Sequence, residues 1–514
     1  MDDILKASAV YRLYTRIVNS IVDSANASAI GRFMTFIITG FRSYLKSSAI
    51  VGFFSRRADR FRGQIKGSVL IDRFLMIKQT DVYSEGSIFT RAFYWVLSVF
   101  RSLTHSIKLD KLLQSSIFAK PWLWCGITVA LAPIVSTKVV IGLVALSFFS
   151  LFFNMSMDRK RNLVYFSINK YVWIYALIYI LATLASVTFS DSLYVGAVTV
   201  LFVLFFIVFT NSIRTRSQLR GVVIAMIWAG AIIALYGFVQ FIFPDRFSGG
   251  WVDEDMFSYR LRVYSTLQNP NVLGEYFLLI IPLAFACLLT AKSRQGRLFY
   301  IVATIAMLAC LVLTYSRGAY LGIIFAIAAF LVLLDRRFIL PGIILAVIIV
   351  LALPTTFIER FTSIGNTSDS STSYRVYIWL GTIAMLRHYW FSGVGPGEGA
   401  FRQVYPVYSY NTISAPHAHN LFLQITCDTG IIGLLIILAV FYQYFKNMFH
   451  TAREASSREQ RIFAIAGISS ILGFIVQSMT DYTFYNYRVM LLFWAVLGIY
   501  MLFTRYDRME ERND

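Results

Sequence analysis

Long apolar runs separated by short polar connections dominate the chain from Trp122 onward. Most approach the roughly 20 residues needed to cross the hydrocarbon core of a bilayer. A backbone in lipid must satisfy its own N–H and C=O groups, so each run is expected to be helical. The pattern predicts twelve spans, over residues 122–137, 139–157, 171–189, 193–210, 221–243, 272–290, 298–314, 319–334, 338–354, 419–445, 462–480 and 489–504.

The composition agrees with this pattern. Of 514 residues, 57% are hydrophobic and 14% are charged, with a mean hydropathy of +0.64, whereas soluble domains have roughly 45–50% apolar and about 25% charged residues. An ordinary soluble enzyme, a disordered protein and a disulfide-stapled secreted domain are thereby excluded. The four cysteines fall inside apolar runs without CxxC spacing, as expected of small buried hydrophobic residues. The expected fold class is an all-α polytopic membrane protein.

Residues 1–120 follow a different pattern, because no run there reaches spanning length. Residues 30–44 and 89–107 instead carry apolar side chains at helical spacing. This basic region is expected to form amphipathic helices on the anionic lipids of the cytoplasmic leaflet. The alternative is a small helical domain that docks on the rest of the protein.

The charge of the connecting loops gives the orientation. Net charge is +20, and the basic residues lie mostly between apolar runs, which favours the positive-inside rule over nucleic-acid binding. With the N-terminus in the cytoplasm, the Lys- and Arg-rich loops all fall inside, as does the tail 506–514. We therefore expect a membrane domain over 121–505, with residues 355–418 as a large extracytoplasmic loop between the ninth and tenth spans.

Two histidines, His417 and His419, stand where this large loop meets a span. A neutral imidazole at a membrane surface is suited to act as a general base. A zinc site would need a third ligand, such as His388. A purely structural role at the start of the helix is the other alternative. Asp428, nine residues into that helix, either orients a histidine, binds a sugar or is a satisfied intramembrane acid.

Arginines approach the same side of the membrane from three separate segments. Arg317 lies between two apolar spans, where it either snorkels to the surface or binds an anion. Arg375 opens an amphipathic stretch of the large loop, and Arg260 and Arg262 precede another span. Guanidinium groups bind phosphate in a bidentate manner, so these arginines and the histidine pair predict a phosphate site with a base. The outer carboxylates do not point to a metal-dependent nucleotide-sugar transferase, which would need cytoplasmic carboxylates to reach its donor, and neither a metal nor a cofactor is expected.

Several of these stretches, in this order and spacing, resemble the O-antigen ligase and O-antigen polymerase superfamily. The resemblance extends over roughly residues 120–505, and the basic extension 1–120 departs from the family pattern. It rests on YSRGAYLG at 315–322, Tyr374-Arg375 with Trp379, GVGPG at 393–397, HAHNLFLQ at 417–424, GIIGL at 430–434, and Arg262 before Asn269-Pro270-Asn271.

The resemblance implies a GT-C-like membrane glycosyltransferase of the bacterial cytoplasmic membrane, with both termini in the cytoplasm. Such enzymes take a glycan from an undecaprenyl-diphosphate carrier on the outer face and transfer it to an acceptor hydroxyl. They invert the anomeric centre and use no metal. By this resemblance His419 is the base, Arg317 and Arg375 with Arg262 hold the diphosphate, and Asn420, Asn269 and Asp428 support the site.

Two other functions compete with glycan transfer. A transporter or flippase of lipid-linked glycans suits twelve spans, but it predicts an internal repeat and charged residues at mid-membrane, neither of which the sequence displays. A non-catalytic scaffold of a polysaccharide assembly complex, with partners bound through residues 1–120, is the third. The motifs do not separate ligase from polymerase.

Overall fold

The computed structural model describes residues 88–106, 117–157, 163–247, 262–335 and 370–509. These residues form helices joined by short connections, without a strand. The helices are α6 (Ile88–Ser106), α8 (Pro121–Leu131), α9 (Thr137–Met157), α10 (Asn169–Leu184), α11 (Phe189–Ser212), α12 (Arg216–Ile242), α13 (Pro270–Thr290), α14 (Arg294–Val312), α15 (Arg317–Leu334), α18 (Ser370–Tyr389), α19 (Glu398–Val404), α20 (Leu421–Glu454), α21 (Arg458–Ser478) and α22 (Tyr487–Phe503).

Eight of these helices are long and apolar enough to cross a membrane, namely α9, α11, α12, α13, α14, α15, α20 and α21. Three shorter apolar helices, α8, α10 and α22, coincide with three more of the predicted spans. The remaining predicted span, 338–354, lies outside the described residues. The prediction of a polytopic helical membrane protein is confirmed, while the number of twelve spans stays a prediction.

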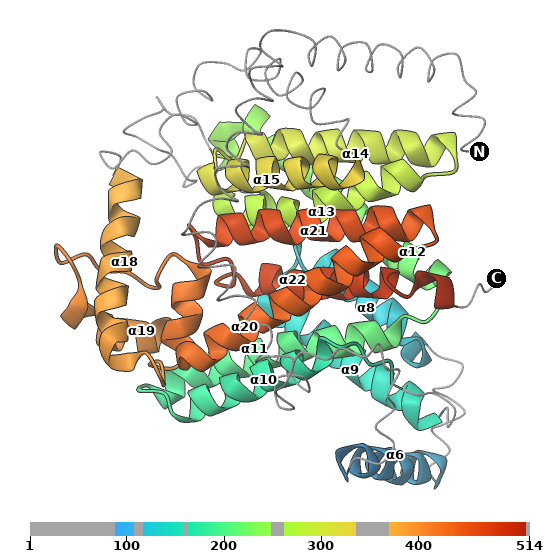
Figure 1. Cartoon of the computed structure of the whole chain (residues 1–514), viewed down its shortest axis with the longest axis horizontal. Helices are drawn as coiled ribbons and strands as arrows, with labels where there is room; N and C mark the ends of the chain where they lie inside the picture. The colour runs from blue at the N-terminus through green and yellow to red at the C-terminus, as the bar shows by residue number, and fades with distance from the viewer. Residues whose placement is uncertain (1–87, 107–116, 158–162, 248–261, 336–369, 510–514) are drawn as a thin grey trace, which may run out of the picture. The chain divides into compact units, whose positions relative to one another are not determined.

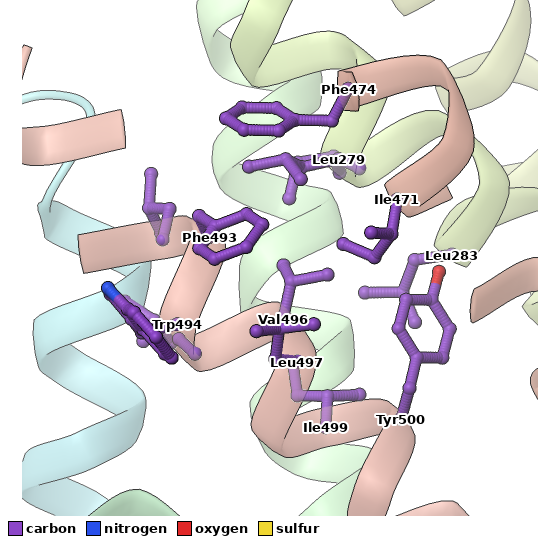
Figure 2. Packing of buried hydrophobic residues seen from close by; sticks show 14 of the residues in the cluster. Leu279, Leu283, Ile471, Phe474, Phe493, Trp494, Val496, Leu497, Ile499 and Tyr500 are labelled. Carbon is purple, nitrogen blue, oxygen red and sulfur yellow. The ribbon is translucent and has the colours of Figure 1, made fainter. Parts of the chain in front are cut away.

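The core of the bundle is formed by α13, α21 and α22. Figure 2 shows Leu279 and Leu283 of α13 facing side chains of α21 and α22. The rings of Phe474 and Phe493 stack with their centroids 5.1 Å apart. All residues of α22 after Tyr487 are buried, although this helix is only 17 residues long, so it lies inside the bundle and contacts little lipid.

The chain divides into two units, Met1–Thr80 and Asp81–Asp514. The first lies outside the described residues, as do the predicted helix at 30–44 and the end of the tail. The helix expected at 89–107 is present as α6, and it packs on α9, where the rings of Phe100 and Phe152 lie 5.0 Å apart. This part of the basic region therefore docks on the membrane domain.

Helix α18 is the first described element of the large loop. It lies across one end of the bundle, beside α19 and the start of α20 (Figure 1). A small core of its own, with Ile378, Met385, Phe401 and Tyr405, holds α18 and α19 together. This arrangement places the loop over the helix ends where the candidate site residues lie.

Candidate functional site

Three helices begin at one end of the bundle with the same local signal. An Asn or Ser side chain caps each of them and accepts a backbone N–H of the first turn: Asn269 for α13, Ser316 for α15 and Asn420 for α20. Short polar side chains are favoured at this position because they satisfy the free N–H groups of the first turn. The predicted supporting residues Asn269 and Asn420 are therefore helix caps.

The residue before each cap has a positive φ angle. These are Gln268 (63°), Tyr315 (50°) and His419 (46°). Non-glycine residues adopt this left-handed conformation at a cost of roughly 1–3 kcal/mol and do so preferentially at functional sites. The sharp turn that it produces directs the chain into each helix and aims the flanking side chains at a common point.

That point is a polar cavity of about 30 Å³, which we call the arginine pocket. Arg262, Arg317 and Arg375 all line it, although they are separated by up to 113 positions in the sequence. Arg260 lies outside the described residues. The complete lining is Arg262, Asn271, Tyr315, Ser316, Arg317, Gly318, Arg375, Gln477, Thr480 and Asp481.

Asp481 is the residue that joins the parts of the site. Its Oδ2 accepts a hydrogen bond from Asn271 Nδ2 at 3.0 Å and lies 3.9 Å from Arg375 Nη2. Its Oδ1 lies 3.5 Å from Nδ1 of His419, a distance that suits an ion pair but is long for a normal hydrogen bond. The side chains of Asp481 and His419 are 14% and 21% exposed, so both are partly accessible.

The arginines are positioned in different ways. Arg262 donates from Nε to the carbonyl of Thr314 and from Nη2 to Asn271 Oδ1, both at 3.1 Å. Arg317 is the first residue of α15, so its side chain leaves from a helix N-terminus, where free N–H groups and the helix dipole favour an anion. Arg375 lies on α18, which brings the large loop to the pocket.

Hydrogen bonds hold the turn formed by His417–Asn420, which we call the histidine turn. Trp379 Nε1 of α18 donates to the carbonyl of His419 at 3.3 Å. The N–H of His419 donates to Nδ1 of His417 at 3.2 Å, and the Asn420 side chain donates to the carbonyl of Met479 at 2.7 Å. The last bond ties the start of α20 to the end of α21, directly before Asp481.

The electrostatics of the site favour a charged Asp481. Burial by itself raises the pKa of this carboxyl, but the neighbouring His419 imidazole and the Arg375 guanidinium outweigh it and bring the pKa below its ordinary value. Asp481 is therefore an anion at neutral pH. It is available to orient the His419 ring and to stabilise the ring once it is protonated.

His417 has the opposite character. It is 7% exposed and packs against the rings of Tyr482 and Tyr485. Burial, followed by the nearby His419, lowers the pKa of His417 to about 3. Its position and its bond to the N–H of His419 favour a structural role for His417.

Acidification should destabilise the protein through His417. An ordinary histidine of an unfolded chain takes up a proton near pH 6.5, while His417 in the folded protein stays neutral down to about pH 3. The unfolded state thus binds the additional proton, and stability is lost as pH falls from about 6.5 toward 3. Thermal unfolding in detergent, followed by Trp fluorescence, should show a smaller fall in Tm between about pH 7 and pH 5 for His417→Asn than for the wild type. Equal falls would contradict this assignment.

Asp428 lies away from the arginine pocket. It is buried in α20, where it accepts from Gln424 Nε2 at 2.8 Å and from the hydroxyl of Tyr179 at 3.3 Å. Gln424 Oε1 in turn accepts the N–H of Ala418 at 2.8 Å. Asp428 is thus a hydrogen-bonded acid within α20, and Gln424 links it to the histidine turn.

The glycine-rich turn at 393–397 is a packing feature of α20. Gly430 interrupts that helix with a φ of 68°, and a Cβ there would lie 1.8 Å from the carbonyl oxygen of Phe391. The N–H of Val394 donates to the carbonyl of Cys427 at 2.6 Å. The turn therefore fills the break in α20 and contributes no side chain to the arginine pocket.

The zinc alternative has no support from the described side chains. The ring of His388 packs against Tyr408, with centroids 5.5 Å apart. Within the described ranges no group of three His, Cys, Asp or Glu side chains is arranged to hold a metal ion.

Sequence reasoning missed Asp481, Thr480 and Gln477. Gln477 lies in the last turn of α21, and Thr480 and Asp481 follow its end. An acid directly after an apolar run was the one available signal. A single carboxylate between two spans is a weak signal, because its partners lie 62, 106 and 210 positions earlier in the chain.

A comparison with known protein families matches a stretch of the chain that contains half of the residues lining the arginine pocket. Residues 302–438 match the family described as O-antigen ligase, a stretch that contains Arg317, Arg375 and His419. No curated protein matches the chain. The resemblance of this polytopic helical membrane protein to the O-antigen ligase superfamily is therefore confirmed, with the matching domain at residues 302–438.

Proposed function

We propose that the protein transfers glycan from a polyprenyl-diphosphate carrier to an acceptor hydroxyl at the outer face of the bacterial cytoplasmic membrane. One observation carries the proposal. Asp481 contacts both His419 and Arg375 and lines the same pocket as Arg262 and Arg317. A base and three fixed cations thus meet at one end of the bundle, as a diphosphate leaving group requires.

The three arginines suit a diphosphate. Two phosphoryl groups offer several acceptor oxygens, and guanidinium groups bind such oxygens in a bidentate manner. The cavity of about 30 Å³ has room for roughly one water molecule. The diphosphate therefore binds across the mouth of the pocket, where Arg375 is 21% exposed.

His419 suits the role of general base. Its Nδ1 faces Asp481, so Nε2 is the nitrogen that accepts a proton from the acceptor. The carboxylate fixes the ring orientation and stabilises the imidazolium, as in an Asp-His pair of a hydrolase. Such contacts are often long without substrate and shorten in the reactive complex.

The chemical step follows from this arrangement. The acceptor hydroxyl gives its proton to His419 Nε2 while its oxygen attacks the anomeric carbon of the donor sugar. The bond between that carbon and the phosphate oxygen breaks, and the electron pair leaves with the diphosphate. Negative charge grows on the leaving group, where Arg262, Arg317 and Arg375 stabilise it. Attack opposite the leaving group inverts the anomeric centre.

Reconstitution with a polyprenyl-diphosphate glycan, radiolabelled in the sugar, tests the proposal. The full chain in liposomes should release the carrier diphosphate and form a labelled glycosidic product, and EDTA should leave both rates unchanged. Movement of intact donor across the bilayer without bond cleavage would instead establish a transporter. Loss of transfer with EDTA would establish a metal requirement.

Arg317→Lys should weaken transfer while the charge is kept. Lysine presents a point charge and lacks the paired donors that match a phosphate, so kcat/KM should fall about 10- to 100-fold. Arg387→Lys, on the same helix as Arg375 but outside the pocket lining, is the matched control and should retain wild-type kcat/KM. Wild-type kinetics for Arg317→Lys would remove this arginine from the diphosphate site.

A further inference from the structure

A second and larger cavity lies within the same bundle. Its volume is about 250 Å³, several times that of the arginine pocket. Five helices and the connection between α13 and α14 contribute to it. We call it the Lys292 cavity, and its lining is Arg220, Val223, Ile224, Cys287, Thr290, Ala291, Lys292, Ser293, Gly296, Tyr300, Glu459, Phe463 and Phe503.

The Lys292 cavity lies at the end of the bundle opposite the arginine pocket. Helix α13 contributes Asn271 to the arginine pocket and Thr290 to the Lys292 cavity. A rise of about 1.5 Å per residue places these two positions about 28 Å apart. The thickness of a bilayer's hydrocarbon core is about 30 Å, so the two cavities lie at opposite faces of the membrane.

The walls of the Lys292 cavity are apolar. Val223, Ile224, Phe463 and Phe503 line it from α12, α21 and α22, and the rings of Phe463 and Phe503 stack with their centroids 3.6 Å apart. Ile224 is 38% exposed on the outside of the bundle. The wall therefore continues onto the surface that faces lipid, which gives an acyl chain a route into the cavity.

Charged groups line the same cavity. Arg220 donates from Nη2 to both carboxylate oxygens of Glu459, at 3.1 and 2.8 Å, and remains 45% exposed. Lys292 is exposed and, within the part of the chain that the structure describes, belongs to no ion pair. Two cations and one carboxylate leave a net positive charge beside an apolar wall.

We propose that the Lys292 cavity binds an anionic phospholipid. Its phosphodiester is held by Lys292 and Arg220, and an acyl chain lies along Ile224 and the phenylalanines. Basic pockets between helices at the membrane surface have the chemistry to bind acidic headgroups, and the apolar wall gives the acyl chain a surface to pack against. The apolar wall distinguishes this site from one for a free phosphate.

Native mass spectrometry of the full chain in detergent tests this proposal with dioleoylphosphatidylglycerol as the probe. The wild type should retain one molecule of this lipid. Lys292→Glu should lower its retention about tenfold, since each basic residue contributes about 1 kcal/mol to an anionic lipid. Lys292→Arg should restore it. Lys446→Glu is the matched control, because Lys446 is exposed on α20 and does not line the cavity; it should bind as the wild type does.

Two further measurements separate the possible ligands. The phospholipid should raise the Tm of the wild type, whereas glycerophosphoglycerol, the headgroup alone, should not. Ile224→Trp, whose larger side chain occupies the space beside the apolar wall, should abolish the rise in Tm caused by the phospholipid. Unchanged retention in Lys292→Glu, equal protection by the headgroup, or equal retention of dioleoylphosphatidylethanolamine would each overturn the proposal. Lipid binding is measured here without glycan transfer, so it does not depend on the proposed function.

Discussion

Replacement of His419 by Ala should lower the rate of glycan transfer by about 10²- to 10⁴-fold, the usual contribution of a positioned general base. His419 is the one histidine of the turn whose ring contacts a carboxylate, at 3.5 Å from Asp481. Without the ring, the attacking hydroxyl loses its positioned proton acceptor. The measurement is single-turnover transfer from a radiolabelled polyprenyl-diphosphate glycan in liposomes, with donor binding followed separately.

The conformation of His419 calls for a second variant. Its φ of 46° disfavours alanine, while Asn accepts this region at lower cost. His419→Asn should therefore keep the fold and lose transfer to the same extent. His450→Ala, at the far end of α20, should leave the rate unchanged. Full activity in both His419 variants would assign the base to another group.

Replacement of Asp481 by Asn should also lower transfer, by up to the roughly 10⁴-fold loss known for an Asp that orients a catalytic histidine. The amide removes the negative charge that faces the His419 ring, and it leaves Arg375 without its anionic partner at 3.9 Å. The loss should appear mainly in kcat, because Arg262 and Arg317 still hold the diphosphate. The same single-turnover assay measures it.

A double-mutant cycle makes the test of Asp481 specific. Asp481→Asn and Arg375→Gln should have non-additive effects, because the two residues contact each other. Asp507→Asn, an exposed carboxylate beside Ser456, is the control for the loss of an acidic charge and should retain wild-type transfer. Strict additivity, or an active Asp481→Asn, would show that this carboxylate serves packing only.

The sequence was sufficient to predict the helices, because apolar length and the demand for backbone hydrogen bonds in lipid leave little choice. It also singled out Arg262, Arg317, Arg375 and His419, because they lie in segments expected on one side of the membrane and match motifs of the family that the chain resembles. The structure brings all four toward one pocket.

The role of Asp481 could not be predicted from the sequence, for a physical reason. Hydrophobic periodicity tells where a helix starts, but it does not tell which helix ends meet in space. The proposed role of the Asp481 carboxylate depends on its contacts with Asn271, Arg375 and His419, which lie on three other segments of the chain. Likewise, the docking of α6 on α9 depends on the contact of Phe100 with Phe152, which an amphipathic pattern alone does not separate from binding to a membrane surface.

The borders of the matched family domain have a practical consequence for engineering. Residues 302–438 contain Arg317, Arg375 and His419, but Arg262, Asn271 and Asp481 lie outside this stretch. A chimera that carries only this stretch in a distant homologue would contain His419 of this protein, but the residue facing its ring in place of Asp481 would come from the homologue. Exchange of specificity between such proteins therefore requires transplanting the segment from Arg262 through the connection of α21 with α22 as one block.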